Sequence, residues 1–129
     1  MPNSKQHREQ ASHNTAFLAA IDVQRFPDWA AVVAFYAAVH LVERLRAKVG
    51  EHSINHIDRL AFLRRPAYRN TLFKAFHVLY NASLIARYET AGSFSSQFAP
   101  ADVKNVLIDQ HLASIDQHVA AEFAPPATN

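Results

Sequence analysis

The sequence predicts an all-helical fold, an antiparallel up-and-down bundle of four long helices and one short helix. Only two glycines and six prolines interrupt 129 residues, half of which are hydrophobic. Apolar residues recur three and four positions apart, the period of a helix with one buried side, and no segment alternates like a strand. We expect residues 1–123 to form one domain and residues 124–129, which contain two prolines, to form a flexible tail.

The first two long helices are predicted over residues 4–21 and 28–49. Asn3 or Ser4 caps the first helix, and Gly50 ends the second at a position where a left-handed residue commonly closes a helix. The buried stripe of the first helix is expected to contain Ala11, Phe17, Leu18 and Ile21.

The second helix is apolar nearly all round between residues 30 and 42. It is therefore expected in the centre of the bundle or at an oligomer interface. Beyond Val42, charged side chains are expected to return it to solvent, namely Glu43, Arg44, Arg46 and Lys48.

The short helix is predicted over residues 53–65, with Ser53 as its cap and Pro66 after its end. Its buried side is expected to hold Ile54, Ile57, Leu60, Ala61 and Leu63. The next long helix, residues 67–89, is expected to bury a stripe made of Tyr68, Leu72, Phe76, Leu79, Ser83 and Arg87.

Residues 90–99 contain Gly92 and three serines and are predicted to form a loop that Phe94 and Phe98 hold in place. The last long helix is predicted over residues 100–123. Its inward positions are expected to be Val103, Val106, Leu107, Ile115 and Val119.

Composition excludes several classes of function. The chain has no cysteine, so disulfides and thiolate metal sites are excluded, and with two glycines a P-loop or Rossmann turn is excluded. The polar N-terminus lacks the apolar core of a secretory signal, and no apolar run is long enough to span a membrane. A formal charge of +2 is too small to indicate nucleic acid by itself. We expect a cytoplasmic protein without cofactors.

In an up-and-down bundle, the helical rise places three polar side chains at similar heights, His40, Arg59 and Tyr80. His56 and Arg87 fall just above them. As a nuclease site, His40 or His56 would be the general acid or base, Arg59 and Arg87 would neutralise phosphate charge, Tyr80 would contact substrate, and no metal would be needed.

A structural role explains the same residues. Buried polar groups must be satisfied whatever the function, which favours a hydrogen-bonded network over a catalytic site. In that case His40 and Tyr80 find partners, and an arginine of the cluster pairs with Asp58 or Glu43.

Three further patterns have a functional and a structural interpretation. His52 and His56 have zinc-ligand spacing, but Ser53 replaces the glutamate of a metalloprotease motif, so no metal is expected. Arg64 and Arg65 form a basic patch that can contact phosphates or lie in solvent at a helix junction. Seven aromatic residues at helical spacing are expected in the core rather than on a base-stacking surface, Trp29, Phe35, Tyr36, Phe73, Phe76, Tyr80 and Tyr88.

Three segments resemble the HEPN superfamily of small helical-bundle proteins. They read DWAAVVAFYAAVH at 28–40, HSINHIDR at 52–59 and YNASLIARY at 80–88. The resemblance implies a dimeric four- to five-helix bundle in a superfamily of prokaryotic defence and toxin–antitoxin systems, with metal-independent ribonucleases and inactive binding members.

The ribonucleases of that superfamily carry an arginine followed by four to six residues and a histidine. Two pairs here have this spacing, Arg8 with His13 and Arg46 with His52, roughly the number that chance predicts. Neither pair lies late in the bundle, where the motif is expected. The resemblance therefore implies an RNA- or nucleotide-associated homodimer and leaves catalysis open. The alternative is a non-catalytic structural or protein-interaction bundle, in which a buried polar network holds the helices in register.

Overall fold

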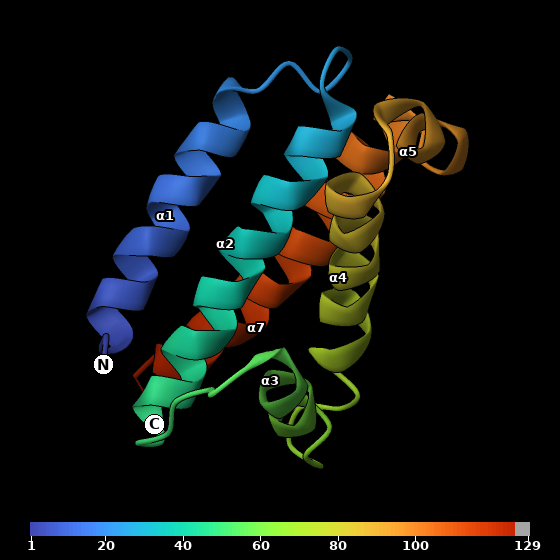
Figure 1. Ribbon diagram of the computed structural model, residues 1–129. Coiled ribbons are helices and arrows are strands. Elements are labelled where there is room, and N and C mark those ends of the chain that lie inside the picture. Colours follow the sequence, from blue (N-terminus) through green and yellow to red (C-terminus); the bar gives the residue numbers. More distant parts are fainter. Residues whose placement is uncertain (126–129) are drawn as a thin grey trace.

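The computed structural model describes residues 1–125, and this part of the chain is all-helical, as predicted (Figure 1). Its elements are α1 Ser4–Ala20, α2 Pro27–Lys48, α3 His56–Leu63, α4 Phe73–Tyr88, α5 Ala91–Gln97, α6 Pro100–Asp102, the π-helical η1 Val103–Leu112 and α7 Ala113–Phe123. None of these helices is long and apolar enough to cross a membrane. The tail predicted at 124–129 lies largely outside the described residues.

Helix α2 is the centre of the fold. It packs against α1, α4, η1 and α7, and its buried side chains run from Pro27 to Arg46 (Figure 1). Pro27 occupies the first turn, where its missing N–H costs nothing. Gly50 has φ +79°, so the predicted left-handed closure is confirmed.

Helix α1 has the predicted bounds and a reciprocal capping box. The Asn3 side chain accepts from the Gln6 N–H, and the Gln6 side chain accepts from the Asn3 N–H. Ala11 and Leu18 are buried as predicted. Phe17 is 59% exposed, so the prediction that it belongs to the buried stripe is wrong. Helix α1 packs chiefly against α2, so it buries only the side chains along that one line of contact.

Helix α3 begins three residues later than predicted, and Asn55 is its cap instead of Ser53. The Ser53 hydroxyl accepts a hydrogen bond from Arg46, and its N–H donates to Glu43, so Ser53 is held by α2. The predicted buried side is wrong for Ile54, Ile57 and Ala61, which are exposed, and Leu60 is half-buried. Phe62 and Leu63 are the buried pair.

Helix α4 begins at Phe73 rather than at residue 67. Residues 67–72 form successive turns in which the Tyr68 carbonyl accepts from the N–H groups of Thr71, Leu72 and Phe73. The predicted stripe is confirmed for Leu72, Phe76, Leu79 and Ser83, which are all buried, whereas Tyr68 and Arg87 are half-buried.

The loop predicted at 90–99 is wrong, because it contains helix α5. Thr90 caps this helix by accepting from the Ser93 N–H, and Phe94 is fully buried and stacks on Phe98 at 5.0 Å. Burial of Phe94 outweighs the low helix propensity of Gly92 and the serines.

The last helical stretch is not one regular α-helix, because η1 is π-helical. The inward positions Val103, Leu107, Ile115 and Val119 are confirmed, whereas Val106 is 36% exposed. Lys104 and Asp109 are ion-paired at 2.6 Å, although residues five apart point about 140° apart on an α-helix. The wider π-helical turn brings them to one side.

Candidate functional site

His56 stands at the first position of α3, where the Asn55 cap fixes the backbone. Its ring stacks on Tyr80 of α4 at 3.7 Å between centroids and 28° between planes. Phe35 of α2 and Phe76 of α4 lie 5.9 and 5.8 Å from the same ring. Rings from α2 and α4 therefore form an aromatic box around the imidazole at the start of α3.

The two ring nitrogens of His56 have different surroundings. Nδ1 lies 3.4 Å from a guanidinium nitrogen of Arg59, while Nε2 is buried and has no hydrogen-bond partner among residues 1–125. Burial, followed by the positive charges of Arg59 and Arg87, lowers the pKa of His56 to about 4. The imidazole is therefore neutral at pH 7, which suits it to accept a proton and not to donate one.

Arg59 is held by a buried carboxylate. Its Nε donates to Glu43 Oε1 at 2.8 Å, and Glu43 Oε2 accepts from the Ser53 N–H at 3.3 Å. Burial raises the pKa of Glu43, but hydrogen bonds from Ser53 and Arg59 outweigh it and lower the pKa overall. The prediction that Glu43 and Arg46 face solvent is wrong, since both are buried. The Glu43–Arg59 ion pair is one of those that the structural interpretation of the sequence predicts.

His40 does not contact His56 but pairs with His7 of α1. Their Nδ1 atoms lie 3.0 Å apart, so one ring donates and the other accepts. Burial lowers the pKa of both rings, and the nearby guanidinium of Arg59 adds to the effect. His7 was not predicted as a site residue, although it lies four residues before Ala11 on the buried stripe of α1.

Arg87 and the aromatic rings around it form a second group, which we call the Arg87 platform. The Arg87 guanidinium donates to the buried Ser83, through its carbonyl and its hydroxyl at 3.2 Å each, and to the Tyr36 hydroxyl at 3.3 Å. Its carbon lies 5.6, 5.8 and 5.4 Å from the rings of Phe35, Tyr36 and Tyr88. No carboxylate within residues 1–125 forms an ion pair with Arg87.

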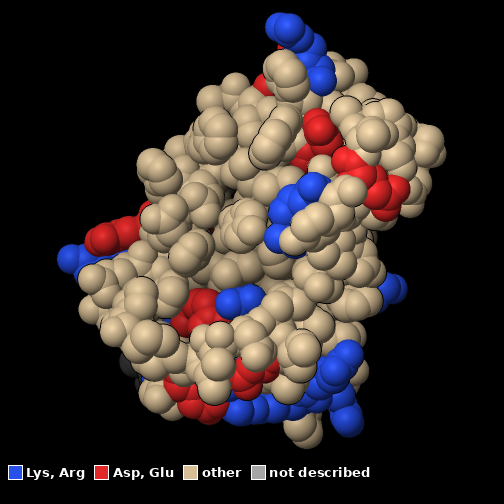
Figure 2. Space-filling view, in the orientation of Figure 1, with Lys and Arg blue, Asp and Glu red and all other residues tan. Residues whose placement is uncertain are grey.

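The prediction that all seven aromatic residues lie in the core is wrong for three of them. Trp29 is 61% exposed, Tyr36 41% and Tyr88 75%. Trp29 and Tyr36 are seven residues apart and share one face of α2. Helix α2 itself lies between α1 and α4 (Figure 1). Figure 2 shows that uncharged side chains cover most of this side of the molecule.

Arg64 and Arg65 lie at the other end of α3, apart from the His56 ring. Arg65 donates to both carboxylate oxygens of Glu51 at 2.8 and 2.7 Å, and hydrogen bonds from Arg65 lower the pKa of Glu51 to about 2. Arg64 lies over the ring of Phe73 at 5.0 Å. The cluster predicted from the sequence is therefore divided among the His56 box, which includes Tyr80, the Glu43–Arg59 pair, the His7–His40 pair and the Arg87 platform. The predicted basic patch of Arg64 and Arg65 lies at the other end of α3.

Within residues 1–125, no three His, Cys, Asp or Glu side chains are grouped in a way that would hold a metal ion. The arrangement instead offers a neutral imidazole in an aromatic box and an arginine beside two exposed tyrosine rings. No protein-family model, no curated protein and no solved structure matches this chain.

Proposed function

We propose that this chain is a HEPN-like helical-bundle module, cytoplasmic and associated with single-stranded RNA in a prokaryotic defence or toxin–antitoxin system. As part of this proposal, the helices form the antiparallel bundle of four long helices and one short helix that the sequence predicts. The observation that carries it is the Arg87 platform. Arginine planes and exposed aromatic rings are the groups on which unstacked RNA bases stack, and the guanidinium also attracts phosphate.

Binding is better supported than catalysis. Arg59, proposed from the sequence to neutralise phosphate, is already neutralised by Glu43. His56 Nε2 is enclosed by the aromatic box, so a substrate must displace a ring to reach it. A proton acceptor with a pKa of about 4 is also a weak general base at neutral pH.

Arg87→Gln is expected to weaken binding of a labelled single-stranded oligoribonucleotide about tenfold or more, because stacking on an aromatic or arginine plane contributes about 1–3 kcal/mol per base. Fluorescence anisotropy without metal ions measures this affinity. Arg64→Gln is the matched control, since it removes one arginine that also lies over an aromatic ring, and its affinity should stay within about twofold.

Equal losses of affinity in Arg87→Gln and Arg64→Gln would show that total charge governs binding, and would contradict RNA binding at the Arg87 platform. Incubating the same mixtures and resolving them on a gel tests catalysis. RNA cleavage that His56→Ala abolishes and Arg87→Gln reduces would establish a ribonuclease site. Cleavage that neither variant changes would assign the activity elsewhere.

A second candidate function is self-association through the exposed face of α2. Trp29, Val33 and Tyr36 follow one another at helical spacing, and none of them carries a charge. A second copy of the chain can cover these uncharged side chains with the same face of its own α2.

We expect light scattering to give about twice 14.5 kDa at micromolar concentration. Trp29→Asp should return the monomer, because burying an unpaired carboxylate opposes association. Val49→Asp is the control, since Val49 is exposed about 30 Å further along α2. A monomer at all concentrations, or equal disruption by both variants, would contradict the α2 interface.

A further inference from the structure

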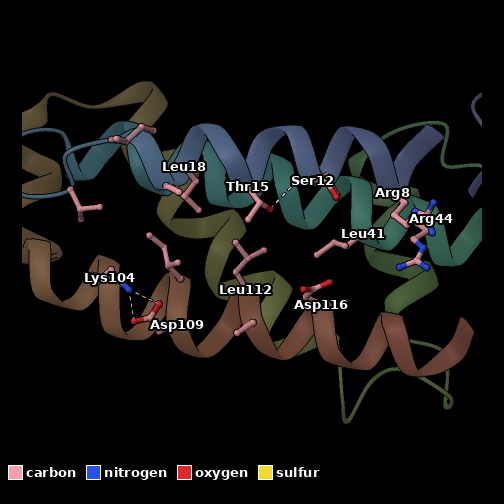
Figure 3. Close-up of a pocket in the computed structure, with 16 residues that line it drawn as sticks. Arg8, Ser12, Thr15, Leu18, Leu41, Arg44, Lys104, Asp109, Leu112 and Asp116 are labelled. Atoms are coloured by element: carbon pink, nitrogen blue, oxygen red, sulfur yellow. Dashed lines mark hydrogen bonds and ion pairs between the residues drawn. The ribbon is translucent and has the colours of Figure 1, made fainter. Parts of the chain in front are cut away.

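A cavity of about 880 Å³ separates α1 from η1 and α7, with α2 as its floor (Figure 3). Apolar side chains line its depth, among them Ala11, Leu18, Leu41 and Leu112. The volume lies in the range of pockets that enclose whole small molecules. The cavity contains none of the residues of the His56 box or the Arg87 platform, so its function is independent of the one proposed above.

The cavity follows from the packing of two helices. Helix α1 packs chiefly against α2 and faces the cavity with short side chains, including Ser12 and Thr15. On the opposite wall, the π-helical turns of η1 place Lys104, Ile108 and Asp109 toward the same space. π-Helical segments are rare and are frequent at functional sites.

The two ends of the cavity differ in charge. Lys104 and Asp109 neutralise each other at one end, whereas Arg8 and Arg44 lie together at the other (Figure 3). No ion pair within residues 1–125 includes either arginine, and Asp116 is the carboxylate that lines this end. The Arg44 guanidinium is fixed over the Phe123 ring at 4.0 Å. The arginine end therefore keeps a net positive charge beside an apolar channel.

The shape of the cavity distinguishes between kinds of occupant. It runs along α1 from Arg8 to Ile21, about 20 Å at the helical rise. An occupant that reaches from the arginine end to the apolar end must therefore be extended over about 20 Å.

The apolar depth of the cavity favours a hydrocarbon chain over an extended peptide. A peptide brings backbone N–H and C=O groups that need partners when they are buried. The walls and floor are mainly helices, whose own backbone groups are already paired, and the Thr15 hydroxyl donates to the Ala11 carbonyl. A hydrocarbon chain needs no such partners.

We propose that this cavity binds a long-chain fatty acid, with its carboxylate between Arg8 and Arg44 and its hydrocarbon tail along α1 toward Ile21. Two guanidinium groups can hold a carboxylate through charge-assisted hydrogen bonds. The tail replaces water against leucine and alanine side chains.

Displacement of the fluorescent fatty acid 11-(dansylamino)undecanoate tests this site. Palmitate should displace the probe at a concentration at least tenfold lower than hexadecanol, which lacks the charge, and hexanoate, which lacks the tail. The Arg8→Gln, Arg44→Gln double variant should remove the preference for palmitate over hexadecanol. Failure of palmitate to displace the probe, or equal displacement by hexadecanol, would overturn the proposal.

Two alanines of α1 supply a matched pair that does not alter the charge. Ala19 lines the tail end of the cavity, Ala16 does not, and both are exposed, so phenylalanine is tolerated by the fold at either position. Ala19→Phe should weaken palmitate binding at least tenfold, and Ala16→Phe should leave it within twofold. Circular dichroism verifies that both remain folded. Equal binding by the two variants would place the ligand outside this cavity.

Discussion

Glu43→Ala is expected to lower the free energy of unfolding by about 3–5 kcal/mol, because it leaves the Arg59 guanidinium buried without its carboxylate. Glu43 is 7% exposed, so water does not replace the missing partner. The variant also removes the acceptor of the Ser53 N–H, which ties the segment before α3 to α2. Urea unfolding followed by circular dichroism measures the change.

Two further variants separate the buried pair from ion pairs in general. Glu9→Ala breaks an exposed pair with Lys5 and should cost less than about 0.5 kcal/mol. The double variant Glu43→Leu, Arg59→Met should be more stable than Glu43→Ala, because it removes both charges together. A loss below about 1 kcal/mol in Glu43→Ala would contradict the structural role assigned to the pair.

Loss of stability at acidic pH is the second large effect expected. The pKa of His56 is about 4 in the folded chain against 6.5 for an unperturbed imidazole, and the pKa values of His7 and His40 are lowered as well. The unfolded chain therefore binds more protons between these values. Stability is fully present above about pH 6.5 and decreases as the pH falls toward 4.

Replacing His56 by phenylalanine isolates its share of this effect. A pKa lowered from 6.5 to about 4 corresponds to about 3 kcal/mol, and because the ring is partly exposed, solvent screening reduces this to about 1–2 kcal/mol. His56→Phe should remove that part of the pH dependence and keep the stacking on Tyr80.

Thermal unfolding of the native chain and of His56→Phe at pH 7, 5.5 and 4 measures this difference in pH dependence. The exposed His118→Phe variant serves as the control and should follow the native chain at each pH. A pH dependence unchanged by His56→Phe would show that His56 does not contribute to acid destabilisation. Stability that rises toward pH 4 in the native chain would contradict the direction assigned to all three histidines.

Helical periodicity predicted those helices that bury a single row of apolar side chains. The stripe on α4 and the bounds of α1 and α2 follow from apolar spacing and from local capping by Asn3, Pro27 and Gly50. The short helix was misplaced because Ser53, a good cap by residue type, is engaged by Arg46 and Glu43 of α2. A contact ten residues back along the chain does not appear in local periodicity.

Much of the site depended on partners that lie far apart in the sequence. His40 pairs with His7 across 33 residues, and Arg87 contacts Tyr36 across 51. The spacing on α2 did not indicate which apolar side chains would be covered, because that helix is apolar nearly all round. The sequence therefore predicts Trp29 and Tyr36 in the core, although both are exposed.

The sequence by itself determined that this chain is helical, where its best-capped helices begin and end, and which polar residues lie near α2 and α4. Those properties depend on capping and on apolar period, which act within a few residues. Only the tertiary structure decided that Glu43 is buried, that Arg87 lies among exposed tyrosines and that α1 leaves a cavity beside η1 and α7. Burial and electrostatics depend on which surfaces meet, and that is set by packing between distant segments.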